Sequence, residues 1–575
     1  MKINKITPQY LNQTRQEHQE KHNQPSFKGG MDMFTSGLRF LDTNQAVGAC
    51  AVDLCSMVIP RTTVDFINRG PSAGTETMRR EATGTTNHAS VGIYGTLAGF
   101  AIATGFNNKY GVKAHKIFAD NHTINIIAQS WQDSLHSGNS DPLKLHVQNF
   151  VDGIKVYNTD NDKVKGYVEI PKEDRNAIVD FLYNDLKNSK SQIISKDAKN
   201  TLYTMITGAT GGEKNVVLSG THGQPDAANT LKTLISNFYN ITKACSTEKA
   251  QEVFKNTTDF AKNDFVNTLK HINLKRSIGG LGIATAIGMS TQPINMYLTK
   301  KKTGQDGFVG VKGRKKDNSF NFKVMKAVVG AAFAAGALAT ITTHPSKFMS
   351  KIQFQGMLPT LDQLKLVYGM TIVSRLLVAR DKDELRESAV KDSLGFLNLL
   401  ILGNMVTKGT ARIFDKSLIN KVNGAGKGFF EKMSGSSLKT RDEVLFSALK
   451  KNGIELVKAD GKALGFKEMM AKVKDLPLET QTELRRKISA LNISQVVGYL
   501  YSGIVLGVGI PKLNIYMTNK SEKKRQAKLA QEEAQNPKPE QNAIPAQTKD
   551  ASKPNFSASV PMLSQENMQF LYQKM

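Results

Sequence analysis

Long apolar stretches rich in small residues alternate with polar segments along this chain. In the first half the apolar stretches cover residues 46–60, 90–105 and 278–298, and in the second half they include 364–379 and 496–517. Runs of this length form either membrane helices or the buried helices of a soluble bundle. We therefore predict a mainly α protein built on a bundle of apolar helices.

One segment of this pattern occurs twice. The stretch ETMRREATGTTNHASVG, residues 76–92, returns as ESAVKDSLGFLNLLILG, residues 387–403. In each copy a charged turn is predicted to lead into an apolar helix, and an acid stands four positions before a base, as an intrahelical ion pair prefers. A carboxylate, a small residue and an amide then share one helical face. The matched pairs are Glu76 with Glu387, Arg80 with Lys391, Glu81 with Asp392, Gly84 with Gly395, Asn87 with Asn398, and Gly92 with Gly403.

Two further blocks repeat in the same order. Residues 34–42, FTSGLRFLD, match residues 354–362, FQGMLPTLD, and the third apolar helix of each half ends alike. The residues repeated at that end are Asn295 and Tyr297 in the first half and Asn514 and Tyr516 in the second. This order predicts an internally duplicated bundle with a polar, mostly helical insertion in each half, the second insertion being 92 residues shorter.

The same patterns predict where the parts of the chain begin and end. The longer insertion should contain a β-hairpin, in which 154–157 and 164–170 flank the turn-rich NTDND, and a helix that starts at Pro171. The expected boundaries are 1–33 for a disordered polar tail, 34–106 for the first two apolar helices, 107–276 for a polar α insertion with a small β element, 277–326 for the third helix and a basic loop, 327–353 for a linking apolar helix, 354–408 for the first two helices of the second copy, 409–494 for a shorter helical insertion, 495–520 for its third helix, and 521–575 for a disordered tail.

The chain is strongly basic. Its formal net charge of +27 over 575 residues and its pI near 9.7 attract it to anionic surfaces. An anionic phospholipid membrane is the expected partner, and nucleic acid is disfavoured because the basic residues are not interleaved with aromatic ones, as base stacking requires. The cysteines Cys50, Cys55 and Cys245 are expected to be buried small hydrophobic residues, with no disulfide framework or zinc site.

The first thirty residues are polar and lack an apolar stretch, which predicts no signal peptide. They end in Ser26-Phe27-Lys28-Gly29, and this SFKG ending resembles the polar tails of uncharacterised bacterial membrane-associated proteins. The resemblance implies a location at the bacterial cytoplasmic membrane and brings no activity or functional residue with it. At the other end, residues 562–572 form either a docking peptide for a protein partner or an incidental apolar patch.

Residues 327–343 are the best candidate for a membrane span. As a helix they cover about 26 Å, slightly less than the roughly 30 Å of bilayer hydrocarbon. Basic residues gather in 299–326 and 512–528, which places the ends of both third helices in the cytoplasm and, with seven spans, the N-terminal tail outside. The alternative is a soluble or peripheral helical protein whose apolar helices form a common core and whose basic faces bind the membrane surface.

Ionisable and amide side chains within or beside the apolar helices are the candidate functional residues, because such groups are costly there and need partners. They form either a transport-like path for an ion or solute, or salt bridges and hydrogen bonds across the repeat interface, such as Glu81 with Arg375; we favour the second interpretation. The candidates are Asp53, Glu76, Arg80, Glu81, Asn87, Arg375, Glu387, Lys391, Asp392 and Asn398. The glycines expected to permit close helix packing are Gly84, Gly92, Gly95, Gly99, Gly395 and Gly403.

Catalysis is only weakly indicated. The Gly-rich residues 208–226 include Ser219, His222 and Asp226, but they have neither Walker spacing nor a nucleophile elbow. A hydrolase within the 107–276 insertion is therefore the weakest hypothesis. No metal site or cofactor is expected, because the ten histidines are scattered. The expected function is structural, scaffolding or transport-like, with no catalytic activity inferred.

Overall fold

The computed structural model describes residues 27–43, 45–157, 167–214, 216–311, 313–421 and 436–535. The described chain is mainly helical, as predicted. The described residues up to Thr518 form one compact unit, and those from Asn519 onward form a second. Of the second unit, the structure describes residues 519–535, the final part of one long helix.

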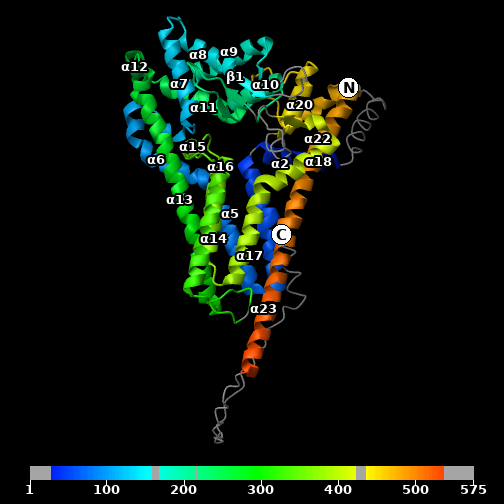
Figure 1. Ribbon diagram of the computed structural model, residues 1–575. Helices are drawn as coiled ribbons and strands as arrows, with labels where there is room; N and C mark the ends of the chain where they lie inside the picture. The colour runs from blue at the N-terminus through cyan, green and yellow to red at the C-terminus, as the bar shows by residue number, and fades with distance from the viewer. Residues whose placement is uncertain are drawn as a thin grey trace, which may run out of the picture. The chain divides into compact units, whose positions relative to one another are not determined.

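Within the described residues, seven helical passages build a bundle in the first unit (Figure 1). The helix α2 (Phe27–Thr43) precedes it. The passages are α3 (Gln45–Val52) with the π-helical turn η1 (Asp53–Val58) and α4 (Ile59–Arg69); α5 (Pro71–Ala89) with α6 (Val91–Tyr110); α13 (Asp264–Thr303); α14 (Phe320–Ala339); α16 (Leu361–Val378); α17 (Lys382–Leu397) with the π-helical turn η4 (Asn398–Leu402) and α18 (Gly403–Phe414); and α22 (Leu478–Ser502) with the π-helical turn η7 (Gly503–Gly509) and the start of α23 (Ile510–Gln535).

Local sequence accounts for several helix ends in the bundle. The chain leaves α4 through Gly70, whose φ of 87° suits glycine, and Pro71 then opens α5 because a first-turn residue needs no amide hydrogen. The helix α16 begins at a capping box in which Thr360 and Gln363 bond to each other's backbone amides. The α4–α5 turn, the loop 304–319 and the α16–α17 turn meet at one end of the bundle, since the Arg69 guanidinium lies over Phe308 and Arg314 pairs with Asp381.

The polar insertions lie beyond the other end of the bundle (Figure 1). In the first, the predicted hairpin is confirmed, because β1 (Ile154–Tyr157) and β2 (Tyr167–Glu169) pair antiparallel, and the predicted helix after Pro171 is α9 (Lys172–Asn188). The hairpin belongs to an antiparallel sheet of order β2-β1-β3-β4. The other elements are η2 (Ala114–Lys116), α7 (Asn121–His136), α8 (Pro142–Gly153), α10 (Lys196–Thr210), β3 (Val216–Leu218), β4 (Ala227–Asn229), α11 (Leu231–Cys245), α12 (Glu248–Asn256) and η3 (Phe260–Lys262).

The second insertion packs onto the first and shares its hydrophobic core. Phe446 and Leu449 of α20 (Arg441–Lys451) lie in the same buried cluster as Trp131, Phe150 and Phe238 of the first insertion. Segments 107–276 and 409–494 therefore form a joint polar domain, although about 130 residues of bundle separate them in sequence. The second insertion consists of η5 (Lys416–Leu418), the paired strands β5 (Ile419–Lys421) and β6 (Ser436–Leu438), α20 (Arg441–Lys451), α21 (Phe466–Lys472) and η6 (Val473–Asp475).

Several element boundaries differ from those expected. The helix α2 begins at Phe27, so residues 27–33 of the predicted tail are helical, and α23 continues to Gln535. The predicted linking helix is α14, which starts earlier at Phe320 and ends at Ala339, followed by the short α15 (Pro345–Lys351). The predicted tails 1–26 and 536–575 lie outside the described residues.

The charged turn expected before each apolar helix is itself helical. Glu76, Arg80 and Glu81 lie within α5, and their counterparts lie within α17. Each of these helices carries buried residues from its first turns to its end. The break comes later in the first half, at Ser90, where α5 and α6 meet at 48°. Of the cysteines, Cys245 is buried as expected, whereas Cys50 is half-buried and Cys55 is exposed on the bundle surface.

Three helical segments of the described chain are long and apolar enough to cross a membrane, or four if α5 and α6 count as one bent span. They are Val47–Arg69, Phe320–Ala339 and Leu478–Glu532. This number is smaller than the seven spans considered from the sequence. In α16, charged residues such as Arg375 interrupt the apolar run, and in α13 the polar residues Gln292 and Asn295 do so.

The bundle carries apolar side chains on its outer surface and charged side chains inside. On α6, for example, Leu97 and Phe100 are each 61% exposed, and on η7 Ile504 is 66% exposed. Buried within the bundle, in contrast, are Arg61 and Asp392. Other exposed apolar residues of the bundle are Ile93, Ile278, Ile283, Ile294, Val324, Val328, Leu338, Leu394 and Leu500. This distribution of polarity is the reverse of that in a water-soluble helix bundle.

Candidate functional site: a buried charge cluster in the bundle

The centre of the bundle holds an ion-pair network between α5, α16 and α17. Arg375 on α16 donates to both carboxylate oxygens of Glu81 on α5, at 2.9 and 3.2 Å, and to Asp392 on α17 at 2.9 Å. Lys391 donates to Glu81 at 2.9 Å, and Arg61 of α4 lies 3.5 Å from the same carboxylate. Arg375 and Glu81 thus form the ion pair that we expected from the sequence, and Asp392 extends it.

A second layer of ion pairs lies nearer the turns of the bundle. Arg380, between α16 and α17, donates through both terminal nitrogens to Glu76 of α5. Arg69, at the end of α4, donates through both terminal nitrogens to Glu387 of α17. Arg69 and Arg380 are 311 positions apart in the sequence, as are Glu76 and Glu387. The two bidentate pairs are therefore equivalent contacts, with the arginine and the glutamate exchanged between the halves.

These residues form one balanced group, which we call the central charge cluster. Glu384 joins its members by accepting from Arg80 at 3.1 Å and from Arg380 at 2.9 Å, and Asp65 accepts from Arg69. The cluster has six basic and six acidic members, so its formal charges cancel. They are Arg61, Asp65, Arg69, Glu76, Arg80, Glu81, Arg375, Arg380, Glu384, Glu387, Lys391 and Asp392.

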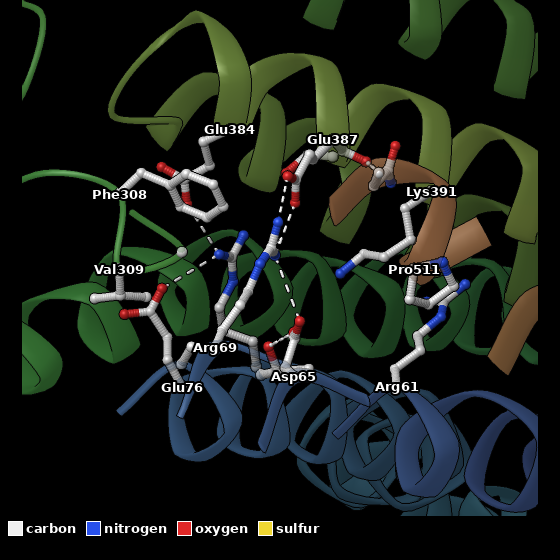
Figure 2. A pocket seen from close by; sticks show the side chains of 16 residues that line it. Arg61, Asp65, Arg69, Glu76, Phe308, Val309, Glu384, Glu387, Lys391 and Pro511 are labelled. Carbon is white, nitrogen blue, oxygen red and sulfur yellow. Dashed lines mark hydrogen bonds and ion pairs between the residues drawn. The ribbon is translucent and has the colours of Figure 1, made fainter. Parts of the chain in front are cut away.

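A small cavity lies within the central charge cluster. Figure 2 shows Arg69 reaching from α4 toward Glu387, with Phe308 and Val309 of the loop 304–319 closing one side. The cavity measures about 40 Å³, and a single water needs roughly 10–15 Å³. It therefore has room for a few water molecules and is too small for an organic solute.

The remaining acidic candidate, Asp53, lies outside the central charge cluster. It is buried in η1, where it accepts a hydrogen bond from the Thr85 hydroxyl of α5. His88 lies 4.0 Å from it, and the other ring nitrogen of His88 is 3.5 Å from Thr371 on α16. Asp53 is therefore held by a hydroxyl and a histidine instead of by an arginine.

The amide candidates tie the middle helices to the third helix of each half. Asn87 of α5 donates to the Ala284 carbonyl of α13 at 2.8 Å, and Asn398 of η4 donates to Ser502 of α22 at 3.0 Å. At the ends of the third helices, Asn295 and Asn514 are buried and donate back to α5 and α17, while Tyr297 and Tyr516 are exposed.

The candidate glycines mark close contacts between helices. A Cβ at Gly84 would lie 3.6 Å from the Arg375 guanidinium, and a Cβ at Gly395 would lie 3.2 Å from that of Arg61. Gly95 faces the Phe354 ring and, with Gly99, faces α13. The remaining two candidates are Gly92, against the Met357 carbonyl, and Gly403, 3.2 Å from Ser502.

Several members of the central charge cluster were absent from the sequence candidates. They are Arg61, Asp65, Arg69, Arg380 and Glu384. Arg69 and Arg380 lie just outside the segment that was matched between the halves, at the same spacing of 311 residues, so extending the match by seven positions would have found them. Glu384 and Asp65 have no equivalent at that spacing, and only the packing reveals them.

The expected intrahelical pairs are only partly formed. Arg80 lies 3.5 Å from Glu76 on the same helix, but it also bonds to Gln292 and Glu384 on other helices. Lys391, predicted to pair with Glu387, donates instead to Glu81. The interhelical contacts prevail because the carboxylates are buried and a nearby guanidinium supplies bidentate bonds.

The polar domain contains a second buried acidic group. The Tyr203 hydroxyl of α10 contacts the carboxyl groups of both Glu213 and Asp442, and Arg39 of α2 donates to Asp442. Burial and the neighbouring Asp442 and Glu443 raise the pKa of Glu213 to about 7. A hydroxyl has one proton to donate, so one of the two carboxyls must donate to Tyr203, and Glu213 is the one protonated near neutral pH.

The hydrolase hypothesis receives no support from the geometry of the Gly-rich stretch. The ring of His222 contacts Asp133 at 2.9 Å, and Asp226 accepts from the Gly220 amide. Ser219 has a buried hydroxyl without a hydrogen-bond partner. Among the described residues, no group of three or more His, Cys, Asp or Glu side chains is arranged to hold a metal ion.

No protein-family model matches this chain, and no curated protein and no solved structure shows significant similarity to it. The site is therefore interpreted from its own geometry. What that geometry defines is a helix bundle with an apolar outer surface, whose interior is locked by compensated ion pairs.

Proposed function

We propose that this protein is a membrane-integrated scaffold, in which an internally duplicated helix bundle anchors a polar domain at the membrane surface. The observation that carries the proposal is the reversed polarity of the bundle. Side chains such as Leu97, Phe100 and Ile504 are exposed, while eight of the twelve members of the central charge cluster are buried and the other four are half-buried. Lipid is the environment in which this arrangement is stable, because apolar groups face hydrocarbon and charges face one another.

The internal duplication is supported by reciprocal contacts. Arg69 bonds to Glu387 and Arg380 bonds to Glu76, and the residues of each kind are 311 positions apart. The third helices also make reciprocal contacts between the two halves. Gly288 of α13 faces Thr371 of α16, whereas Gly507 of η7 faces Ser56 and Pro60 in the first passage. Each half therefore contributes a third helix that packs on the first helix of the other half.

The buried charges favour a scaffolding role over transport because they are already paired with one another. The six basic and six acidic groups of the central charge cluster compensate one another, and their cavity of about 40 Å³ leaves room only for water. A transport site needs groups that can exchange a protein partner for a solute. Here the carboxylate of Glu81 is already held by Arg375 and Lys391.

Alkaline carbonate extraction of membranes that contain the protein tests the proposal. An integrated bundle stays in the membrane pellet after carbonate and after 1 M salt. The alternative, a peripheral protein held by its net charge of +27, is released by salt because exposed charges are screened within a few ångströms at that ionic strength. Recovery in the supernatant would overturn the scaffold proposal and establish the peripheral alternative.

A further inference from the structure

A cavity of about 730 Å³ lies between the first insertion and the segment that leads into α16. Its insertion side is formed by α10, α11 and the residues around Glu213, and its bundle side by residues 355–364 and Thr96 of α6. Asn237 of α11 joins the two sides by donating to the Gln355 carbonyl at 2.9 Å. The volume is that of a typical site for an organic ligand.

The insertion side of this cavity is cationic. Lys199, Lys214 and Lys232 line it, and Lys116 and His115 stand at the α6 side. Within the described chain, neither Lys199 nor Lys232 forms an ion pair with an acid, and Lys232 lies over the Tyr203 ring at 4.0 Å. Burial and the charge of Lys232 lower the pKa of Lys199, as expected for neighbouring ammonium groups.

The acidic residue that lines the cavity, Glu213, forms no salt bridge with Lys199 or Lys232 in the described chain, although the charge of Lys232 acts on its carboxyl group. Glu213 bonds to Tyr203, and its pKa of about 7 keeps it mostly protonated in mildly acidic conditions.

The start of α11 adds to the positive potential. Its N-cap residue, Thr230, makes no side-chain capping bond and lines the cavity. The Leu231 amide donates to the Glu213 carbonyl, which leaves the next two amides of the first turn, those of Lys232 and Thr233, without a cap.

The opposite side of the cavity is apolar. Met357, Leu358 and Leu361 line it and are 65%, 43% and 44% exposed. Their segment is fixed to the bundle, because the Met357 carbonyl lies against Gly92 of α6 and Thr360 caps α16. The cavity thus places a cationic surface and an apolar surface face to face.

We propose that this cavity binds an anionic phospholipid, with the phosphate among Lys199, Lys214 and Lys232 and the acyl chains along Met357, Leu358 and Leu361. Lysine ammonium groups and helix amides bind phosphate, and apolar side chains displace water from acyl chains. The assignment goes beyond the scaffold role. It depends on the two surfaces of the cavity and holds whether the bundle spans the bilayer or lies on it.

The test measures lipid binding to the full chain purified in a non-ionic detergent. Three probes are compared by thermal shift and native mass spectrometry: dioctanoyl phosphatidylglycerol, dioctanoyl phosphatidylcholine and inorganic phosphate. Phosphatidylglycerol should bind saturably, and phosphatidylcholine roughly tenfold or more weakly because it lacks net negative charge. Phosphate alone should also bind weakly because it makes no apolar contact. Equal binding of phosphate and phosphatidylglycerol would show a free-anion site and overturn the lipid assignment.

Variants locate the bound lipid. Lys199→Glu with Lys232→Glu should lower phosphatidylglycerol affinity by about tenfold or more, whereas Lys249→Glu with Lys255→Glu, on the exposed face of α12, makes the same change in net charge and should leave it unaltered. Met357→Gln, at a largely exposed position, should weaken lipid binding without changing the weak binding of phosphate. Parent-like lipid binding by both the lysine variant and Met357→Gln would place the lipid elsewhere and overturn the proposal.

Discussion

Buried charges in this protein are stable because each has a specific partner. Arg375 contacts Glu81 and Asp392, and both of these carboxylates are buried. Removing one partner of such a group is costly, since the other is left buried and uncompensated. The cost of a substitution therefore depends on how many partners remain.

Replacing Glu81 tests this directly. Glu81→Leu leaves Arg375, Lys391 and Arg61 with one acid fewer among them, and we expect it to lower the free energy of unfolding by about 3–5 kcal/mol. Asp392→Leu should cost less, because Arg375 keeps Glu81. Thermal unfolding in detergent measures both, with the exposed Lys249→Ala expected within about 0.5 kcal/mol of the parent. If both leucine variants melt like the parent, the central charge cluster does not hold the bundle together.

The conservative Glu81→Gln separates the scaffold from a transporter. In the scaffold, a neutral amide still leaves Arg375 and Lys391 undercompensated, so Glu81→Gln should also melt below the parent. In a transporter, the same variant would keep the parent's stability and lose solute flux.

Glu213 makes the stability of the polar domain depend on pH. Its pKa is about 7 in the folded protein and about 4.5 when unfolded, so the fold favours the protonated form. Its stabilising contribution is full below the unfolded pKa and is lost as the pH rises through 7, a loss of up to about 3 kcal/mol. Glu213→Gln, which stays neutral, should therefore be more stable than the parent at pH 8.5 but not at pH 5. A stability difference that is the same at both pH values would contradict this.

At the scale of elements, glycines decide how closely helices approach. The helix α13 crosses α6 so closely that a Cβ at Gly280 would lie 2.7 Å from the Gly95 Cα, whereas a Cβ at Gly282 meets nothing within 4 Å. A side chain at position 280 would have to push the backbones of α6 and α13 apart. Two packed backbones cannot move aside as a flexible side chain can.

These neighbouring glycines form a matched pair of substitutions. Gly280→Ala should destabilise the bundle by about 1–3 kcal/mol through overpacking. Gly282→Ala should leave stability unchanged or raise it by up to about 1 kcal/mol, because alanine has the higher helix propensity. Unfolding in detergent compares them. Equal effects of the two substitutions would exclude the close crossing of α6 and α13.

At the scale of the whole molecule, the course of α13 links the topology to the charge distribution. The helix has 40 residues, about 60 Å, and joins the polar domain at Asp264 to the basic end at Lys300–Lys302. Positive residues favour the cytoplasmic side. In the proposed scaffold, the polar domain and this basic end therefore lie on opposite sides of the membrane.

Single cysteines can report this topology after the native cysteines are replaced by alanine. Lys249→Cys, in α12, should react with a membrane-impermeant maleimide added to intact cells, and Lys302→Cys should react only after permeabilisation. Labelling of both positions from the same side would mean that α13 does not cross the membrane.

The sequence by itself determined the helical class, the hairpin whose first strand is 154–157, and the pairing of Glu81 with Arg375. These follow from local propensity and from the high cost of an unpaired charge among apolar residues. The fuller arrangement was decided only by the tertiary structure. It brings Arg69 to Glu387 and Arg380 to Glu76 across more than 300 residues, sends Lys391 to Glu81 instead of Glu387, and merges two distant insertions into one core. A residue's spacing along its own helix limits its neighbours on that helix, but its partner on another helix depends on how the helices pack.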